Sequence, residues 1–118
     1  MAWKIQLELG TLTVDETVLA RVSGAAAMEV FGIVGMASKQ ALRDGLSELL
    51  GMENLAKGVY VTLTPEGAII DMHVVVRYGT KISEVAKNVQ ARVHYVLSQT
   101  LGIDVQAVNV HVENVQYS

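Results

Sequence analysis

The sequence lacks cysteine altogether and has one proline, one tryptophan and one phenylalanine among its 118 residues. The absence of cysteine excludes disulfides and thiolate metal ligands, which suits a reducing cytosol. Because aromatic residues make up only 5% of the chain, an apolar core has to be built from aliphatic side chains and methionine. A chain of this length buries about two-thirds of the surface that its unfolded form exposes. We therefore predict a single domain, spanning residues 1–118, with an aliphatic core.

Basic residues and long apolar runs are also scarce. Nine Lys and Arg residues against twelve Asp and Glu residues give a net charge of -3, and no basic cluster offers a footprint for phosphates. The longest apolar stretch, residues 24–37, contains Glu29 and is shorter than the roughly 20 residues that span a membrane. The N-terminal segment MAWKIQLELG lacks the apolar centre of a signal peptide. We expect a cytoplasmic protein that binds no nucleic acid and does not insert directly into a membrane.

Residues 74–115 predict a strand, a helix and a second strand, and the rest of the fold is organised around this unit. Valines open the segment as a strand, which Gly79 ends. Thr80 stands where a residue caps the helix that follows, and Gly102 stands where a helix end favours a left-handed residue. After that glycine, valines alternate with polar residues, as in a half-buried strand. The apolar face of the helix consists of residues at three- and four-residue spacing: Ile82, Val85, Val89, Val93, Val96 and Leu97.

The N-terminal part of the chain predicts one strand and one helix. Alternation of apolar and polar residues predicts a first strand that ends at Gly10. Thr13 and Glu16 have the spacing of a capping box, which predicts a helix to about residue 28. Val14 and Val18 belong to the predicted packed stripe of this helix, which Leu19 and Ala26 flank. The small residues near its end permit a close approach to a sheet.

The middle of the chain predicts three strands and another helix. Residues 30–36 mix strand formers with two glycines, which favours a short strand with a bulge. Residues 38–51 carry a leucine stripe that is typical of a helix. Residues 59–64 and 68–78 form the arms of a predicted hairpin, because residues 65–67 carry the proline and glycine of a turn. The predicted fold is an α+β two-layer sandwich, in which a mostly antiparallel sheet has its helices packed on one face.

Strand parity gathers polar side chains on the sheet face that the predicted helices leave open. Asp71 and His73 point away from the apolar set of their strand, and the last strand presents His111 in the same way. A metal site needs three or four convergent ligands, and general acid–base chemistry needs a pocket, neither of which an open sheet face provides. We therefore assign no catalytic, cofactor or metal residues, and this face is either solvated or covered by another protein chain. The candidate partner-binding residues are Asp71, His73, Arg77, Asn109, His111 and Glu113.

Two segments, RYGTKISEVAKNVQARV and GIDVQAVNVHVENV, closely resemble the C-terminal signature of the alkaline shock protein family, the envelope stress response proteins of Gram-positive bacteria. The resemblance extends to GTLTVDETVLARVSGAAAMEVFGIVGMAS and to the hairpin GVYVTLTPEGAIIDMHVVV. It implies a small, non-enzymatic cytoplasmic protein without a cofactor, which in some members is held at the membrane by a separate anchoring protein. Residues 39–57 fall where members vary, and the family offers no catalytic residues to carry over.

Three classes of function are compatible with the residues and the resemblance. The leading hypothesis is a protein-interaction or scaffold domain that supports cell-envelope homeostasis and the envelope (alkaline) stress response, through self-association, a membrane-anchoring protein, or both. An RNA-binding or metabolic regulatory module is the alternative, although GXXG clamps and RNP-type aromatic strands are missing. An enzyme or small-ligand binder predicts an apolar cavity on which His73, His111 and Glu113 converge.

Overall fold

A computed structural model of the chain describes residues 2–37 and 56–117. Residues 38–51, for which the sequence predicts a helix, lie outside the described residues. The α+β class that the sequence predicts is confirmed. The elements of the described ranges are β1 (Ala2–Leu7), β2 (Gly10–Asp15), α1 (Glu16–Met28), β3 (Ile33–Met36), β4 (Val59–Thr64), β5 (Gly67–Arg77), α3 (Ile82–Thr100) and β6 (Val105–Gln116).

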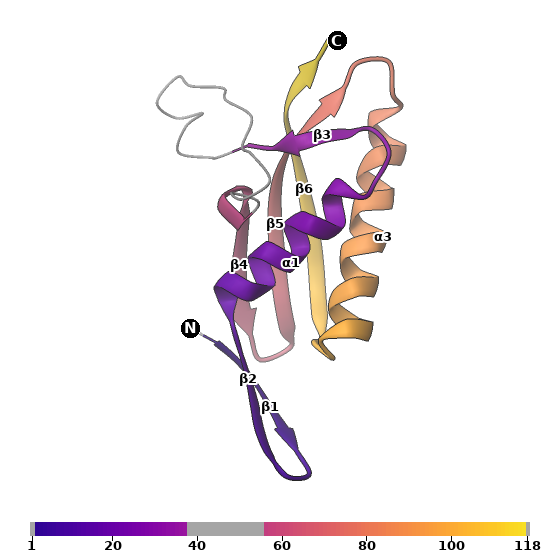
Figure 1. The fold of residues 1–118 in the computed structure, drawn as a ribbon. Coiled ribbons are helices and arrows are strands. Elements are labelled where there is room, and N and C mark those ends of the chain that lie inside the picture. Colours follow the sequence, from indigo (N-terminus) through magenta and orange to yellow (C-terminus); the bar gives the residue numbers. More distant parts are fainter. Residues whose placement is uncertain (1, 38–55, 118) are drawn as a thin grey trace.

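The central strand of the main sheet is β5, which pairs along both of its edges (Figure 1). Along one edge it pairs antiparallel with β4, from Gly67 opposite Thr64 to Met72 opposite Val59, and then with β3. Along the other edge it pairs parallel with β6 over nearly its whole length. The unit of strand, helix and strand that the sequence predicts is therefore formed by β5, α3 and β6.

The predicted hairpin of β4 and β5 is confirmed, although its turn is shorter than expected. Thr64 pairs with Gly67, so that Pro65 and Glu66 alone form the turn. Gly67 has a φ of 142°, and a Cβ atom at this position would lie 2.8 Å from the carbonyl oxygen of Asp104. Only glycine fits there, because the connection between α3 and β6 passes so close to the backbone.

The helices α1 and α3 lie on the same face of the main sheet (Figure 1). The sheet contacts of α1 are with β3, β4 and β5, α3 contacts β6, and the two helices pack against each other. The predicted apolar face of α3 is buried, apart from Ile82 at its start and Val96 at its edge. The predicted two-layer arrangement is confirmed, with an aliphatic core between the layers. The largest fully buried apolar side chains are Leu19, Met36, Ile70, Met72, Val74, Val76, Val89, Val93, Leu97 and Ile103.

The N-terminal residues form a two-stranded hairpin that extends away from the main sheet (Figure 1). The strands β1 and β2 pair antiparallel, from Ala2 opposite Asp15 to Leu7 opposite Gly10. The predicted first strand is confirmed, but it ends at Leu7, three residues before the predicted end, and Gly10 begins the return strand. The segment TLTV that follows is rich in β-branched residues, which favour a strand over the first turn of a helix.

The first helix begins later than the capping box predicts. Glu16 is the first residue of α1, and Asp15 is its N-cap, whose Oδ1 accepts a hydrogen bond from the Thr17 N–H at 2.8 Å. The predicted cap at Thr13 is wrong, because Thr13 pairs with Lys4 inside the hairpin. An aspartate one residue before the helix satisfies a free N–H as well as a threonine would.

The packed face of α1 also differs from the predicted stripe. Val18 is 44% exposed, whereas Leu19 and Ala26, which were expected only to flank the stripe, are buried. The shift arises because Val14 belongs to β2 and reaches the core from the hairpin, so it shares no helical face with Val18. Among the small residues near the end of α1, Ser23, Gly24, Ala26 and Ala27 are buried, whereas Ala25 is exposed.

The ends of α3 confirm one of the two predicted caps. Gly102 has a left-handed φ of 68°, and the N–H of Ile103 donates to the carbonyl oxygen of Leu97 at 3.2 Å, which closes the helix end. At the start of the helix, no side chain caps a backbone N–H. Thr80 instead donates its hydroxyl to the carbonyl oxygen of Arg77 at 2.7 Å. Its predicted capping role is wrong, because the turn after β5 already engages the hydroxyl.

The Asp15 cap predicts a pH-dependent contribution to stability. The hydrogen bond from the Thr17 N–H favours the ionised carboxylate and lowers the pKa of Asp15 in the folded chain. The stabilisation is therefore present above the unfolded pKa of about 3.9 and is lost as the pH falls through the folded pKa. We expect Asp15→Ala to lower the free energy of unfolding at pH 7 by more than it does at pH 3, as measured by urea unfolding. An equal loss at both pH values would contradict the cap, and Asp15→Asn, which caps without a charge, is the control.

Candidate functional site

The face of the main sheet opposite α1 and α3 carries the polar side chains that alternate with the core residues of β5 and β6. Within residues 2–37 and 56–117, no helix packs on this face (Figure 1). It is named the open face here. We define it by the side chains of Tyr60, Asp71, His73, Asn109, His111 and Glu113.

His73 is the most enclosed of these side chains, with only 7% of its surface exposed. Its Nδ1 lies 2.9 Å from Oε1 of Glu113 on β6. On the other side, the ring of Tyr60 on β4 stands at 86° to the imidazole, with 5.5 Å between the ring centroids. A buried polar group costs free energy unless it is hydrogen-bonded. His73 is thus held in place by the two strands that flank β5.

An irregularity in β6 explains how Glu113 reaches His73. Between the pairs His73–His111 and Val75–Asn114, β6 has one more residue than β5. Such an extra residue is a β-bulge, which increases the local twist and redirects side chains. Glu113 lies within this bulge, and its carboxylate contacts the imidazole.

Asp71 holds the second half of the cluster. Its Oδ1 accepts a hydrogen bond from Nδ2 of Asn109 at 3.0 Å and lies 3.3 Å from Nε2 of His111. The imidazole of His111 stacks on that of His73, with 4.6 Å between the centroids and 14° between the planes. The side chains of Asp71 and His111 are 32% and 45% exposed. These groups therefore face solvent while they hold one another in position.

Five of the six predicted residues thus form one connected cluster. Arg77 lies on the same side of the sheet at the end of β5, opposite Gln116, and among the described residues no hydrogen bond links its side chain to the cluster. Tyr60 belongs to the open face but was not among the predicted residues. Counting back from the turn at Pro65 would have found it, because the hairpin register places Tyr60 opposite Asp71.

The cluster presents hydrogen-bonding groups on a pre-formed surface. Two carboxylates each lie next to an imidazole. In the part of the chain that the structure describes, no group of three or more His, Asp or Glu side chains could hold a metal ion. The imidazoles of His73 and His111 stack on each other, with their planes nearly parallel. This geometry suits recognition of another surface through hydrogen bonds and shape.

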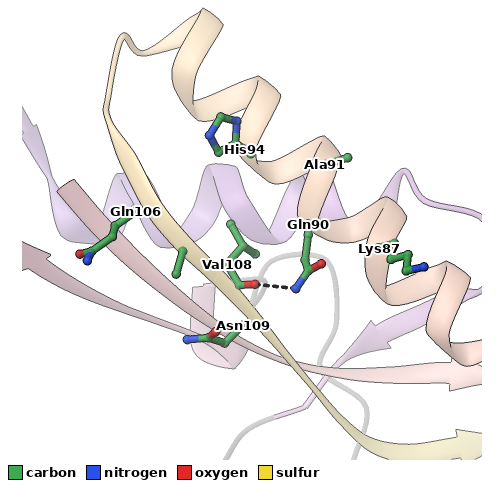
Figure 2. A pocket seen from close by; sticks show the side chains of 8 residues that line it. Lys87, Gln90, Ala91, His94, Gln106, Val108 and Asn109 are labelled. Atoms are coloured by element: carbon green, nitrogen blue, oxygen red, sulfur yellow. Dashed lines mark hydrogen bonds between the residues drawn. The ribbon is translucent and has the colours of Figure 1, made fainter. Parts of the chain in front are cut away.

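A groove lies beside the outer edge of β6, between that strand and α3 (Figure 2). Lys87, Gln90 and His94 line it from the helix, and Gln106 and Val108 line it from the strand. Nε2 of Gln90 donates to the carbonyl oxygen of Val108 at 2.9 Å. His94 is exposed at this boundary, in line with its position beside the apolar face of the helix. A helix side chain therefore covers one backbone carbonyl of the strand edge.

A family model with a cell envelope-related function matches residues 4–117, which include the whole open face. The chain belongs to the alkaline shock protein 23 family. The family resemblance that the sequence motifs indicate is thereby confirmed. The matched family is described by its relation to the cell envelope and by no enzymatic reaction.

Curated relatives share nearly the full length of this family member. The uncharacterized protein YloU of Bacillus subtilis is 46% identical over 116 residues, which cover 98% of this chain and 97% of the relative. An uncharacterized protein of Streptococcus pyogenes is also 46% identical over 116 residues, covering 98% of this chain and 96% of its own. YqhY of Bacillus subtilis is 32% identical over 109 residues, or 92% of this chain and 79% of the relative.

No solved structure matches the chain. None of the helices in the described ranges combines the length and the apolar character that a membrane crossing requires.

Proposed function

We propose that this member of the family is a non-enzymatic protein-interaction domain that supports cell-envelope homeostasis and the envelope stress response. The observation that carries the proposal is the cluster on the open face, in which His73 pairs with Glu113 and His111 pairs with Asp71. The cell envelope-related function of the family supports the cellular setting. The open face is the surface that binds the partner.

The pre-formed contacts of the open face favour binding to a protein. Side chains that are already held by stacking and hydrogen bonds lose little conformational entropy when a partner binds. Tyr60, which is 41% exposed beside His73, supplies an aromatic anchor of a kind that is enriched in interfaces. The partner is a protein surface that contacts this ring and offers hydrogen-bonding groups to Asn109 and His111.

The partner also accounts for a connection to the envelope. In this proposal the chain acts in the cytoplasm and reaches the membrane through an anchoring protein, through self-association, or through both. It needs no cofactor and inserts no segment of its own into the bilayer.

Capture of partners from the native host tests this role of the open face. We expect the tagged chain to recover a discrete protein partner, and the double variant Asn109→Ala with His111→Ala to reduce recovery at least about tenfold, which corresponds to about 1.4 kcal/mol of binding free energy. Both residues are exposed, so the variant should keep its fold. Parallel captures with and without detergent show whether the partner resides in the membrane.

The matched control is the double variant Asn88→Ala with Gln99→Ala, which alters two exposed polar residues on the outer face of α3. It should recover the same partner as the unmodified chain. Undiminished recovery by a folded open-face variant would refute the role of this surface.

A further inference from the structure

The outer edge of β6 presents backbone groups to solvent. Within the described residues, β6 (Val105–Gln116) pairs with β5 alone. The Val108 carbonyl points to the outer edge, because it accepts a hydrogen bond from Gln90 of α3 (Figure 2). Alternate residues of a strand direct their backbone groups to the same edge, so the N–H and C=O groups of Val110 and Val112 also point outward. Such groups are a template for pairing with another strand.

Two side chains limit the stretch of backbone groups at this edge that is open to pairing. Gln90 occupies the carbonyl of Val108 at one end. At the other end, Oδ1 of Asn114 accepts a hydrogen bond from the N–H of Val115 at 2.8 Å. His111 lies midway between Val108 and Asn114 in the sequence. The stretch of open backbone groups is therefore centred on His111, and a side-chain hydrogen bond to the backbone closes it at each end.

We infer that a second copy of this chain pairs antiparallel with this edge, with the two His111 residues opposite each other across a two-fold axis. In this register Val110 of each copy lies opposite Val112 of the other, and these two pairs exchange the backbone hydrogen bonds. The half-buried valine side chains meet on the helix side of the sheet. On the open face, the amide of Asn109 lies opposite the carboxylate of Glu113 of the second copy.

The self-complementarity of the edge is what selects a second copy as the occupant. Apolar side chains face apolar ones, an amide donor faces a carboxylate acceptor, and each closed end faces the closed end of the other copy. An interface of this kind, in which both partners use the same patch, is the common form of a symmetric dimer. Pairing joins the two main sheets into one and places both open faces on the same side. The inference rests on the proposed interaction role, for which it names one partner.

Single-cysteine variants test the register directly, because the chain has no cysteine of its own. Opposed residues of a non-hydrogen-bonded antiparallel pair have Cβ atoms about 4.5–5.5 Å apart, close enough for a disulfide after a small adjustment. We expect His111→Cys to form a disulfide-linked dimer of two 12.7 kDa chains under mild oxidation. The control is Thr62→Cys, which is exposed on the same side of the sheet but on β4. It should cross-link at least about tenfold more slowly.

A proline at the edge provides a second test that does not rely on cross-linking. Val112→Pro removes an outward N–H while it spares the hydrogen bonds to β5. We expect this variant to sediment as a folded monomer, whereas Val112→Ala keeps the N–H and sediments as a dimer. Equal cross-linking rates at positions 111 and 62, or a folded proline variant that still dimerises, would overturn the inference.

The failure of this inference is distinct from the failure of the proposed function. If position 111 cross-links no faster than position 62 but partner capture still depends on Asn109 and His111, the second copy is ruled out and the partner surface stands. If the cysteine dimer forms but no partner is captured through the open face, the inferred dimer is supported and the proposed partner-binding role of the open face is refuted.

Discussion

Replacing Leu97 with alanine is expected to lower the free energy of unfolding by about 2–5 kcal/mol. Leu97 is fully buried on the inner face of α3, so the substitution removes apolar contacts and leaves a cavity that the neighbouring side chains fill only in part. Its carbonyl oxygen also accepts the N–H groups of Leu101 and Ile103 at 3.2 Å each, which fixes the turn into β6. Loosening this position therefore affects the helix and the strand that follows.

Urea unfolding measures the effect as a lower transition midpoint with an unchanged dependence on denaturant. The control is Gln99→Ala, two residues further along the same helix, where the side chain is exposed. Its effect should stay within about 0.5 kcal/mol. If Leu97→Ala lowers the free energy of unfolding by less than about 1 kcal/mol, α3 does not pack on the sheet at the position of Leu97.

The unit formed by β5, α3 and β6 could be predicted because its local signals agree with its tertiary contacts. The valine run, the helical stripe through Val89 and Val93, and the left-handed position of Gly102 each specify one element. The same residues also pack into the core or close the helix end. A sequence of this kind leaves few alternatives for the backbone.

The N-terminal hairpin could not be predicted because its local signals are ambiguous. The spacing of Thr13 and Glu16 fits a capping box, but Thr13 also favours a strand as a β-branched residue. Pairing with Lys4 decides the outcome, and it depends on a turn that contains no strong turn dipeptide. Thr80 was misassigned for a similar reason, because its hydroxyl bonds back to the preceding turn.

The composition of the open face could be predicted in part. Strand parity places Asp71, His73 and His111 on one side of the sheet, and the structure confirms this. Parity alone gives no register between strands that are distant in sequence, so it could not pair His73 with Glu113 through a bulge. It also placed Arg77 with the cluster, although that residue lies at the far end of the strand.

The two C-terminal segments that resemble the family signature, residues 77–93 and 102–115, serve two purposes in this structure. Most of their residues build the fold, through the buried stripe of α3 and the core-facing valines of β6. Those that packing does not explain are Asn109, His111 and Glu113, which project to the open face. Because they alternate with core-facing residues on the same strand, a partner that binds them contacts a strand that is anchored in the core.

Replacing Tyr60 with a photoreactive phenylalanine derivative tests the partner surface inside the host cell. The side chain lies on the open face beside His73, but on β4, away from the outer edge of β6. A derivative of similar size keeps the aromatic contact and stays partly exposed. The probe itself therefore lies away from the residues that pair in the inferred dimer.

The most direct measurement of the central claim is the set of adducts that forms on irradiation of these cells. With the probe at position 60 we expect one discrete adduct heavier than the 12.7 kDa chain, which disappears when Asn109→Ala and His111→Ala are added. With the same probe at the exposed position of Gln99 on α3, we expect none. The absence of an adduct at position 60, or the same adducts from positions 60 and 99, would contradict the role of the open face as a protein-binding surface.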